Sequence, residues 1–84
     1  MSTDIDEPLK TGVIFDRQLI RPAWFVWNGR RYAVRQVTQR WQTKEGQAPI
    51  LHVGVTDGAS TFELTLNQHS LIWRLAAVEA NGCA

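Results

Sequence analysis

The chain contains a single cysteine, Cys83, which excludes an intramolecular disulfide framework. Small secreted domains usually depend on such crosslinks, so the sequence favours a reducing, cytoplasmic environment. No apolar run approaches the roughly 18 residues that span a membrane, and the acidic, polar start lacks the features of a signal peptide. A chain of 84 residues with 44% hydrophobic content therefore predicts one small domain with one core.

Acidic residues are absent between Arg17 and Lys44, although the whole chain has a net charge of only +1. Seven of the nine basic residues lie in this segment, which therefore carries +7 on its own. An uneven charge distribution can steer an anionic partner even when the total charge is close to zero. The basic residues of the segment are Arg17, Arg21, Arg30, Arg31, Arg35, Arg40 and Lys44.

Groups of residues that would support catalysis or metal binding are also missing. His52, His69 and Cys83 are the only soft metal ligands, and none of them pairs at a standard metal spacing. Asp57 precedes Gly58 and is typical of a turn, while the six glycines are scattered instead of forming a phosphate-binding loop. We therefore expect a protein that is not an enzyme and that uses no metal or cofactor.

The segment Trp24–Trp41 holds three of the four tryptophans, the only tyrosine and four arginines. Within it, Asn28-Gly29 lies between two β-prone runs, and both residues tolerate the positive φ of a type I′ turn. The pattern predicts a hairpin formed by residues 24–27 and a long strand over residues 31–41. The apolar positions of that long strand shift phase, which predicts a β-bulge near Arg35-Gln36.

Alternating apolar residues predict further strands on both sides of this hairpin. These strands cover residues 13–15, 50–56 and 61–66, and the last two are joined by a turn at residues 57–60. Residues 70–80 fit either a helix or a strand. We expect a strand there, because two hairpins expose sheet edges that need a partner.

The sequence thus predicts an all-β fold, a small antiparallel barrel of SH3-like or OB-like type with five to six strands and one long bulged strand. The barrel is expected to occupy residues 11–80. Residues 1–10 are expected to form a flexible acidic tail, and residues 81–84 a short C-terminal tail.

The tryptophans are expected to divide between the core and the surface. Trp24 and Trp27 differ by three positions and lie on opposite faces of a regular strand, so at most one of them belongs to the core. Tyr32, Trp41 and Trp73 are expected in the core, because so small a chain needs large side chains to fill its interior.

The pattern P-x-W-F-x-W-N-G-R-R-Y-x-V-x-x-V-x-x-R-W at Pro22–Trp41 resembles a small bacterial domain family of unknown function. In that family a D-G turn, here Asp57-Gly58, leads into an apolar strand, and a final strand carries an aromatic residue, here Trp73. The family occurs as short stand-alone proteins and beside DNA polymerases of the lesion-bypass type. The resemblance covers about residues 20–80 and implies an accessory domain without catalytic residues.

Cations interleaved with aromatic rings along a strand are typical of single-stranded nucleic-acid binding, in which guanidinium groups contact phosphates and rings contact bases. We therefore expect a binding module for single-stranded DNA or RNA, monomeric or weakly dimeric, with no membrane partner. The alternative is a protein-interaction module that accepts a peptide in an aromatic groove or at a sheet edge. Two further interpretations are a solvated strand face that limits aggregation and a regulatory subunit without chemistry of its own. The candidate contact residues are Arg30, Arg31, Arg35, Arg40, Lys44 and Trp27.

Overall fold

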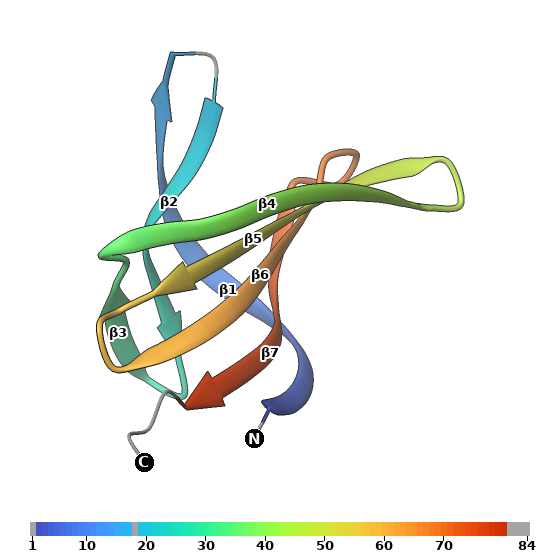
Figure 1. Ribbon diagram of the computed structural model, residues 1–84. Coiled ribbons are helices and arrows are strands. Elements are labelled where there is room, and N and C mark those ends of the chain that lie inside the picture. Colours follow the sequence, from blue (N-terminus) through green and yellow to red (C-terminus); the bar gives the residue numbers. More distant parts are fainter. Residues whose placement is uncertain (1, 18, 81–84) are drawn as a thin grey trace.

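The computed structural model describes residues 2–17 and 19–80, in which all regular secondary structure is β-strand. The strands form one antiparallel sheet in the order β3-β2-β1-β7-β6-β5-β4 (Figure 1). The all-β prediction is confirmed, but the predicted number of five to six strands is wrong. The seven strands are β1 (Ser2–Asp16), β2 (Leu19–Trp27), β3 (Arg30–Ala33), β4 (Gln36–Glu45), β5 (Ala48–Thr56), β6 (Ser60–Asn67) and β7 (Ile72–Ala80).

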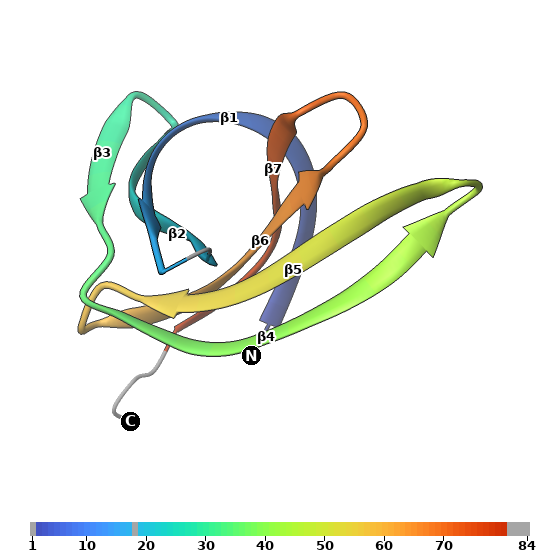
Figure 2. The same ribbon diagram turned by 90° about the horizontal axis from the view of Figure 1, so that it is seen from above.

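The sheet curls into a half-barrel, so that β3 and β4, its two edge strands, meet at one corner (Figure 2). Two consecutive residues between them make this corner. The backbone N–H of Val34 donates to the Ala23 carbonyl of β2 at 2.9 Å, and that of Arg35 donates to the Thr56 carbonyl of β5 at 2.8 Å. The backbone thus passes from one edge of the sheet to the other within a single peptide unit.

The expected long strand over residues 31–41 is therefore two strands, and its prediction as one continuous element is wrong. The chain leaves β3 at Val34 because it must pair with β2 before this point and with β5 after it. A register shift is present, but it lies between Val37 and Gln39 inside β4 and not near Arg35-Gln36. The phase shift in the sequence thus combines a corner with a bulge a few residues later.

The N-terminal residues differ from the expected flexible tail, because Ser2–Asp16 form the longest strand of the sheet. The first part of β1 pairs with β7, and residues 10–16 pair with β2. Backbone hydrogen bonds in a sheet do not depend on apolar side chains, so a polar segment can supply the partner that β7 needs. Leu9 also packs against the core. The predicted tail at residues 81–84 lies outside the described residues.

The core lies on the concave side of the sheet and draws on β2, β5, β6 and β7. The predicted alternation at residues 50–56 and 61–66 is confirmed in β5 and β6. The strand predicted at residues 70–80 is present as β7, although residues 70 and 71 belong to the preceding turn. In the β2–β3 hairpin, Phe25 is fully buried, and the ring of Tyr32 stacks on it at 5.2 Å between ring centroids. The buried core residues are Phe25, Leu51, Val53, Val55, Phe62, Leu64, Leu66, Trp73 and Leu75.

The tryptophans divide between the two faces as the strand geometry requires. Trp27 and Tyr32 pack against the core, whereas Trp24 lies on the opposite face of β2. Trp73 is buried, as predicted. The prediction for Trp41 is wrong, because this residue is 37% exposed and stacks on His52, its cross-strand neighbour, at 4.9 Å between centroids.

Both predicted turns have the expected chemistry. Asn28 and Gly29 have φ values of 54° and 74°, as a type I′ turn requires. In the second turn, the Asp57 carboxylate accepts hydrogen bonds from the backbone N–H groups of Ala59 at 2.9 Å and Ser60 at 2.8 Å. Burial raises the pKa of Asp57, but these hydrogen bonds outweigh burial, and the pKa lies below its ordinary value.

Candidate nucleic-acid interface

The structure places Trp27 and Arg30 on the core side of the β2–β3 hairpin, where they form the pair next to the turn. The indole of Trp27 packs near Tyr32, with 6.1 Å between ring centroids, and its N–H is buried. The guanidinium of Arg30 lies over the ring of Tyr32, 5.3 Å from its centre. Trp27 therefore contributes to the core and does not present the free ring face that base stacking needs.

The other predicted contact residues are distributed around the molecule. Arg35 lies over the second turn, because a Cβ placed on Gly58 would be 2.9 Å from the Nη1 atom of Arg35. Arg40 donates from Nη1 to the Ile20 carbonyl at 2.8 Å, and Lys44 lines a hollow on a different face. The corner at Val34-Arg35 explains this distribution, because it sends the two halves of the basic segment to opposite edges of the sheet.

Arg31 is the predicted residue around which a basic surface does form. Its guanidinium lies 4.6 Å from the centre of the Trp24 ring, on the face of β2 and β3 that points away from the core. This distance is within the range of a cation–π contact, in which the flat guanidinium covers the face of the indole. The pair thus presents a flat and positively charged surface to solvent.

Strand β1 completes this surface. Lys10 pairs with Val26, which in turn pairs with Arg31, so the two cations flank Val26 on one face. Gly12 pairs with Trp24, and the indole lies so close over the glycine that any Cβ there would overlap it. We call the surface formed by these five residues the basic face. The sequence pattern pointed to Arg31 but missed Lys10 and Trp24, since only the register of β1 brings them together.

The strands that form the basic face carry few acidic residues in this part of the chain. Between residues 8 and 35, which cover β2, β3 and most of β1, the sequence has one acid, Asp16. Next to the basic face, Arg21 and Arg35 line a hollow of about 180 Å³ together with Ile14 and Val34. Arg21 and Arg35 thus add two cations beside the basic face.

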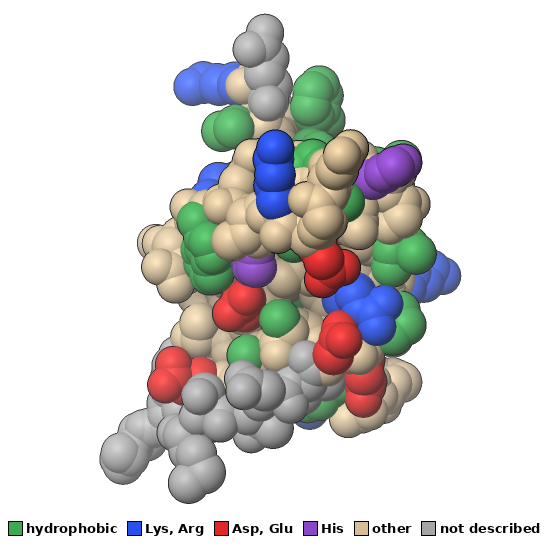
Figure 3. All heavy atoms as spheres, turned by 90° about the vertical axis from the view of Figure 1, so that its right-hand side faces the viewer, with side chains coloured by type: hydrophobic (Ala, Val, Ile, Leu, Met, Phe, Trp, Pro, Cys, Tyr) green, Lys and Arg blue, Asp and Glu red, His purple; other side chains and the backbone are tan. Residues whose placement is uncertain are grey.

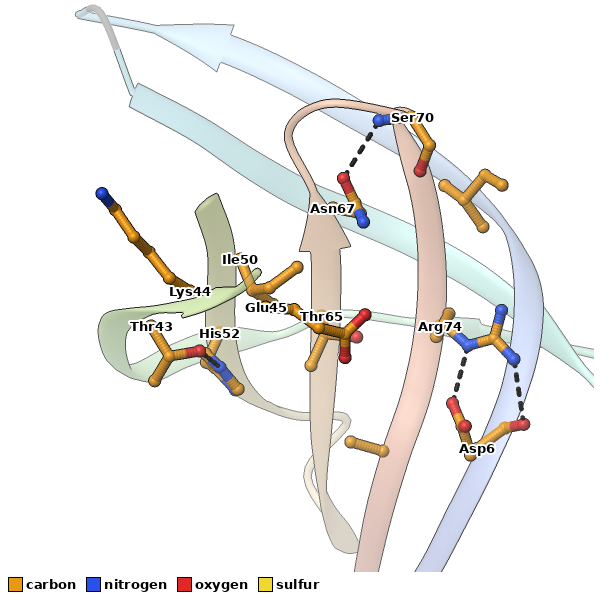
Figure 4. Close-up of a pocket in the computed structure, with 12 residues that line it drawn as sticks. Asp6, Thr43, Lys44, Glu45, Ile50, His52, Thr65, Asn67, Ser70 and Arg74 are labelled. Carbon is orange, nitrogen blue, oxygen red and sulfur yellow. Dashed lines mark hydrogen bonds and ion pairs between the residues drawn. The ribbon is translucent and has the colours of Figure 1, made fainter. Parts of the chain in front are cut away.

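The opposite half of the sheet carries a hollow of about 420 Å³ with side chains of both charges (Figure 4). Arg74 donates to the Asp6 carboxylate at 2.6 Å on its rim, and Lys44 and Glu45 are neighbours on another side of it. A space-filling view of this side of the molecule likewise shows acidic and basic side chains close together (Figure 3). This mixture distinguishes it from the basic face and gives it no preference for an anion.

A polar relay that the sequence pattern did not reveal crosses three strands on this side. The imidazole of His52 contacts the Thr43 hydroxyl through Nε2 at 2.7 Å and the Glu63 carboxylate through Nδ1 at 3.1 Å. The order hydroxyl, imidazole, carboxylate is that of a general-base relay, and it also satisfies polar side chains on adjacent strands. Trp41 stacks on the imidazole and fixes its orientation. The relay could not be predicted, because it depends on the register of β4, β5 and β6.

Within the described residues, no three His, Cys, Asp or Glu side chains gather to hold a metal ion. In the same part of the chain, no helix is long and apolar enough to cross a membrane. No family model, curated protein or solved structure matches the chain.

Proposed function

We propose that this protein is a non-enzymatic binding module that holds single-stranded nucleic acid on the basic face. The observation that carries the proposal is the guanidinium of Arg31 stacked at 4.6 Å on Trp24, with Lys10 two strands away on the same face. Bases stack on aromatic rings and on guanidinium planes, and cations on either side contact the phosphates. A flat cationic surface bordered by a second cation combines both requirements.

The spacing of the two cations is compatible with a chain-like ligand. Lys10 and Arg31 belong to strands that both neighbour β2, so their backbones lie about 10 Å apart, two strand spacings. Two cations at this separation can contact successive phosphates of a strand. The neighbouring hollow, with Arg21 and Arg35, extends the path in the same half of the sheet.

The remaining parts of the proposal follow from the sequence. We assign the half-barrel to the SH3-like or OB-like type, and we place the protein in the bacterial cytoplasm. The resemblance of Pro22–Trp41 to a family found beside lesion-bypass polymerases makes single-stranded DNA the ligand of choice. On this proposal the module assists a DNA transaction without chemistry of its own, as a monomer or weak dimer.

Replacing Lys10 and Arg31 together by alanine should weaken binding to a short fluorescein-labelled oligothymidine. The wild type is expected to bind with micromolar or weaker affinity at low salt. Each phosphate contact on a single strand contributes about 0.7 to the slope of log K against log salt, so the double variant should lose about 1.4 from that slope. Fluorescence anisotropy at three salt concentrations measures both quantities. Arg31→Lys should keep the slope and lose affinity, because lysine retains the charge but not the plane.

The matched control is Lys44→Ala combined with Arg74→Ala. This variant removes one lysine and one arginine as well, but from the hollow in the other half of the sheet. It should bind oligothymidine as the wild type does. Absence of binding at low salt, or equal losses in the two double variants, would reject the basic face as a nucleic-acid site.

A further inference from the structure

Beyond the corner, the half-barrel has two open strand edges, one on β2 and one on β4. Strand β4 pairs only with β5, and β3 covers β2 only from Trp24 to Trp27. No strand of the described chain therefore pairs with the outer edge of β4 or with residues 19–22 of β2 on this side. Unpaired edges of this kind are templates for the addition of another strand.

The two edges separate as they leave the corner. At the corner, the backbone N–H groups of Val34 and Arg35 donate hydrogen bonds directly to carbonyl groups of β2 and β5. Further along, the bridge is the guanidinium of Arg40, which donates to the backbone carbonyl of Ile20 at 2.8 Å. Because a long side chain and not a backbone N–H makes this connection, the main chains of β2 and β4 are too far apart to pair here.

A cleft of about 360 Å³ lies where the edges part, and we call it the seam. Its size falls in the range of ligand-binding pockets. Three consecutive residues of β4, Arg40 to Gln42, line it, so the backbone edge of the strand borders the cleft as well as its side chains. The complete lining is Leu19, Ile20, Arg40, Trp41, Gln42, Leu51 and Gln68.

The lining of the seam combines four apolar residues with two glutamines and one cation. Leu19 is 55% exposed and Trp41 is 37% exposed, although both are large apolar side chains, and the core residue Leu51 also lines the cleft. Arg40 is the one charged residue among the described residues that line the cleft. An occupant that complements this surface carries an aliphatic side chain and, close to it, a carboxylate.

We infer that the seam accepts an extended peptide of a partner protein, which adds as a strand to the open edge of β4. Its main chain pairs with β4, one aliphatic side chain fills the space between Leu19 and Trp41, and an acidic side chain pairs with Arg40. Main-chain hydrogen bonds supply affinity in this mode of recognition, and the pocket for alternate side chains supplies specificity. The seam shares no residue with the basic face, so the inference does not depend on nucleic-acid binding.

The test begins with a phage-displayed library of random short peptides selected on the wild-type protein. The expected consensus alternates aliphatic residues with other residues and contains Asp or Glu next to one of them. A synthetic peptide of that consensus, labelled with fluorescein, is then measured by anisotropy. Leu19→Gln should weaken its binding about tenfold, because the peptide loses the apolar surface that it buries.

The matched control is Leu71→Gln, the same change at a side chain that is 70% exposed in the β6–β7 turn. This variant should bind the peptide as the wild type does. Arg40→Met should weaken binding of the acidic peptide but not binding of a peptide that has Gln in place of the acidic residue. Hydrogen exchange at the backbone amides of residues 40–42 should slow when the peptide is bound, which distinguishes strand addition from simple apolar contact.

Four outcomes would overturn the inference: no enriched consensus, equal losses in Leu19→Gln and Leu71→Gln, equal effects of Arg40→Met on the two peptides, or unchanged exchange along β4. Displacement of the peptide by oligothymidine would assign the seam to nucleic acid and would reject it as well. The Lys10→Ala, Arg31→Ala double variant should bind the peptide normally, so failure of this inference and failure of the nucleic-acid proposal can be told apart.

Discussion

Replacing Phe25 by alanine is expected to lower the free energy of unfolding by about 3–5 kcal/mol. Phe25 is fully buried, and the substitution leaves a cavity at the centre of the core. It also removes two ring contacts, the stacked contact with Tyr32 at 5.2 Å and the edge contact with Phe62 at 5.0 Å between centroids. Both losses act in the same direction, and this is the largest effect that we expect from a single substitution.

Urea denaturation followed by tryptophan fluorescence measures the change. A domain of this size has a total stability of about 4–13 kcal/mol at roughly 0.05–0.15 kcal/mol per residue, so the variant should lose a large part of its stability. Phe15→Ala is the matched control, because Phe15 is 72% exposed on the β1–β2 hairpin and its removal should cost less than about 0.5 kcal/mol. Similar midpoints for the two variants would contradict the described core.

An aromatic cluster of Phe25, Tyr32 and Phe62 stabilises the half-barrel across its interior. Tyr32 of β3 lies 5.3 Å from Phe62 of β6, between centroids, and Phe25 of β2 contacts both rings. β2 and β3 are neighbours at one end of the sheet, whereas β1 and β7 separate β2 from β6, so the rings connect this end to β6 across the interior. The same hairpin places Trp24 and Arg31 on its other face, where the basic face forms. One segment therefore serves both stability and the proposed binding.

The local parts of the fold could be predicted, because their signals are local. Asn28-Gly29 encodes a two-residue turn through the φ values that its residues tolerate, and Asp57 encodes the next turn through its carboxylate. The alternation of Phe62, Leu64 and Leu66 indicates which face of β6 is buried, whatever its neighbours are. Each of these predictions needs fewer than ten neighbouring residues.

Pairing between distant segments could not be predicted in the same way. Nothing in the composition of residues 2–10 indicates a strand. The first part of β1 forms because β7, from the other end of the chain, pairs with it. Trp41 has the size of a core residue, yet its register opposite His52 places it on the outer face of β4. Such facts depend on the closure of the sheet and leave no local pattern in the sequence.

The candidate site shows the same limit. The absence of acids between Arg17 and Lys44 identifies a basic segment, since this is a property of composition. The arrangement of the cations is set by the corner at Val34-Arg35, which separates Arg31 from Arg40. The basic face then gains Lys10 from a segment that the sequence pattern assigned to a tail.

Replacing Gly29 by valine should lower the free energy of unfolding by about 1–3 kcal/mol. Gly29 has a φ of 74°, a left-handed conformation that a β-branched residue adopts only at a cost. A Cβ at this position would meet no heavy atom within 4 Å, so the expected loss comes from backbone strain and not from a clash. The turn also sets the register of Trp27 and Arg30, whose side chains close one end of the aromatic cluster.

Thermal and urea denaturation of Gly29→Val beside Gly29→Asn tests the origin of that loss. Asparagine is larger than glycine but tolerates the left-handed region, so Gly29→Asn should lose much less stability than the valine variant. Equal losses in the two variants would indicate crowding by any side chain, in conflict with the open space around the turn. An unchanged melting temperature for Gly29→Val would mean that the hairpin turns without a positive φ at this residue. The NMR chemical shifts of Trp27 and Tyr32 should change in the valine variant. Strain at the turn reaches the aromatic cluster through the adjacent Trp27–Arg30 pair.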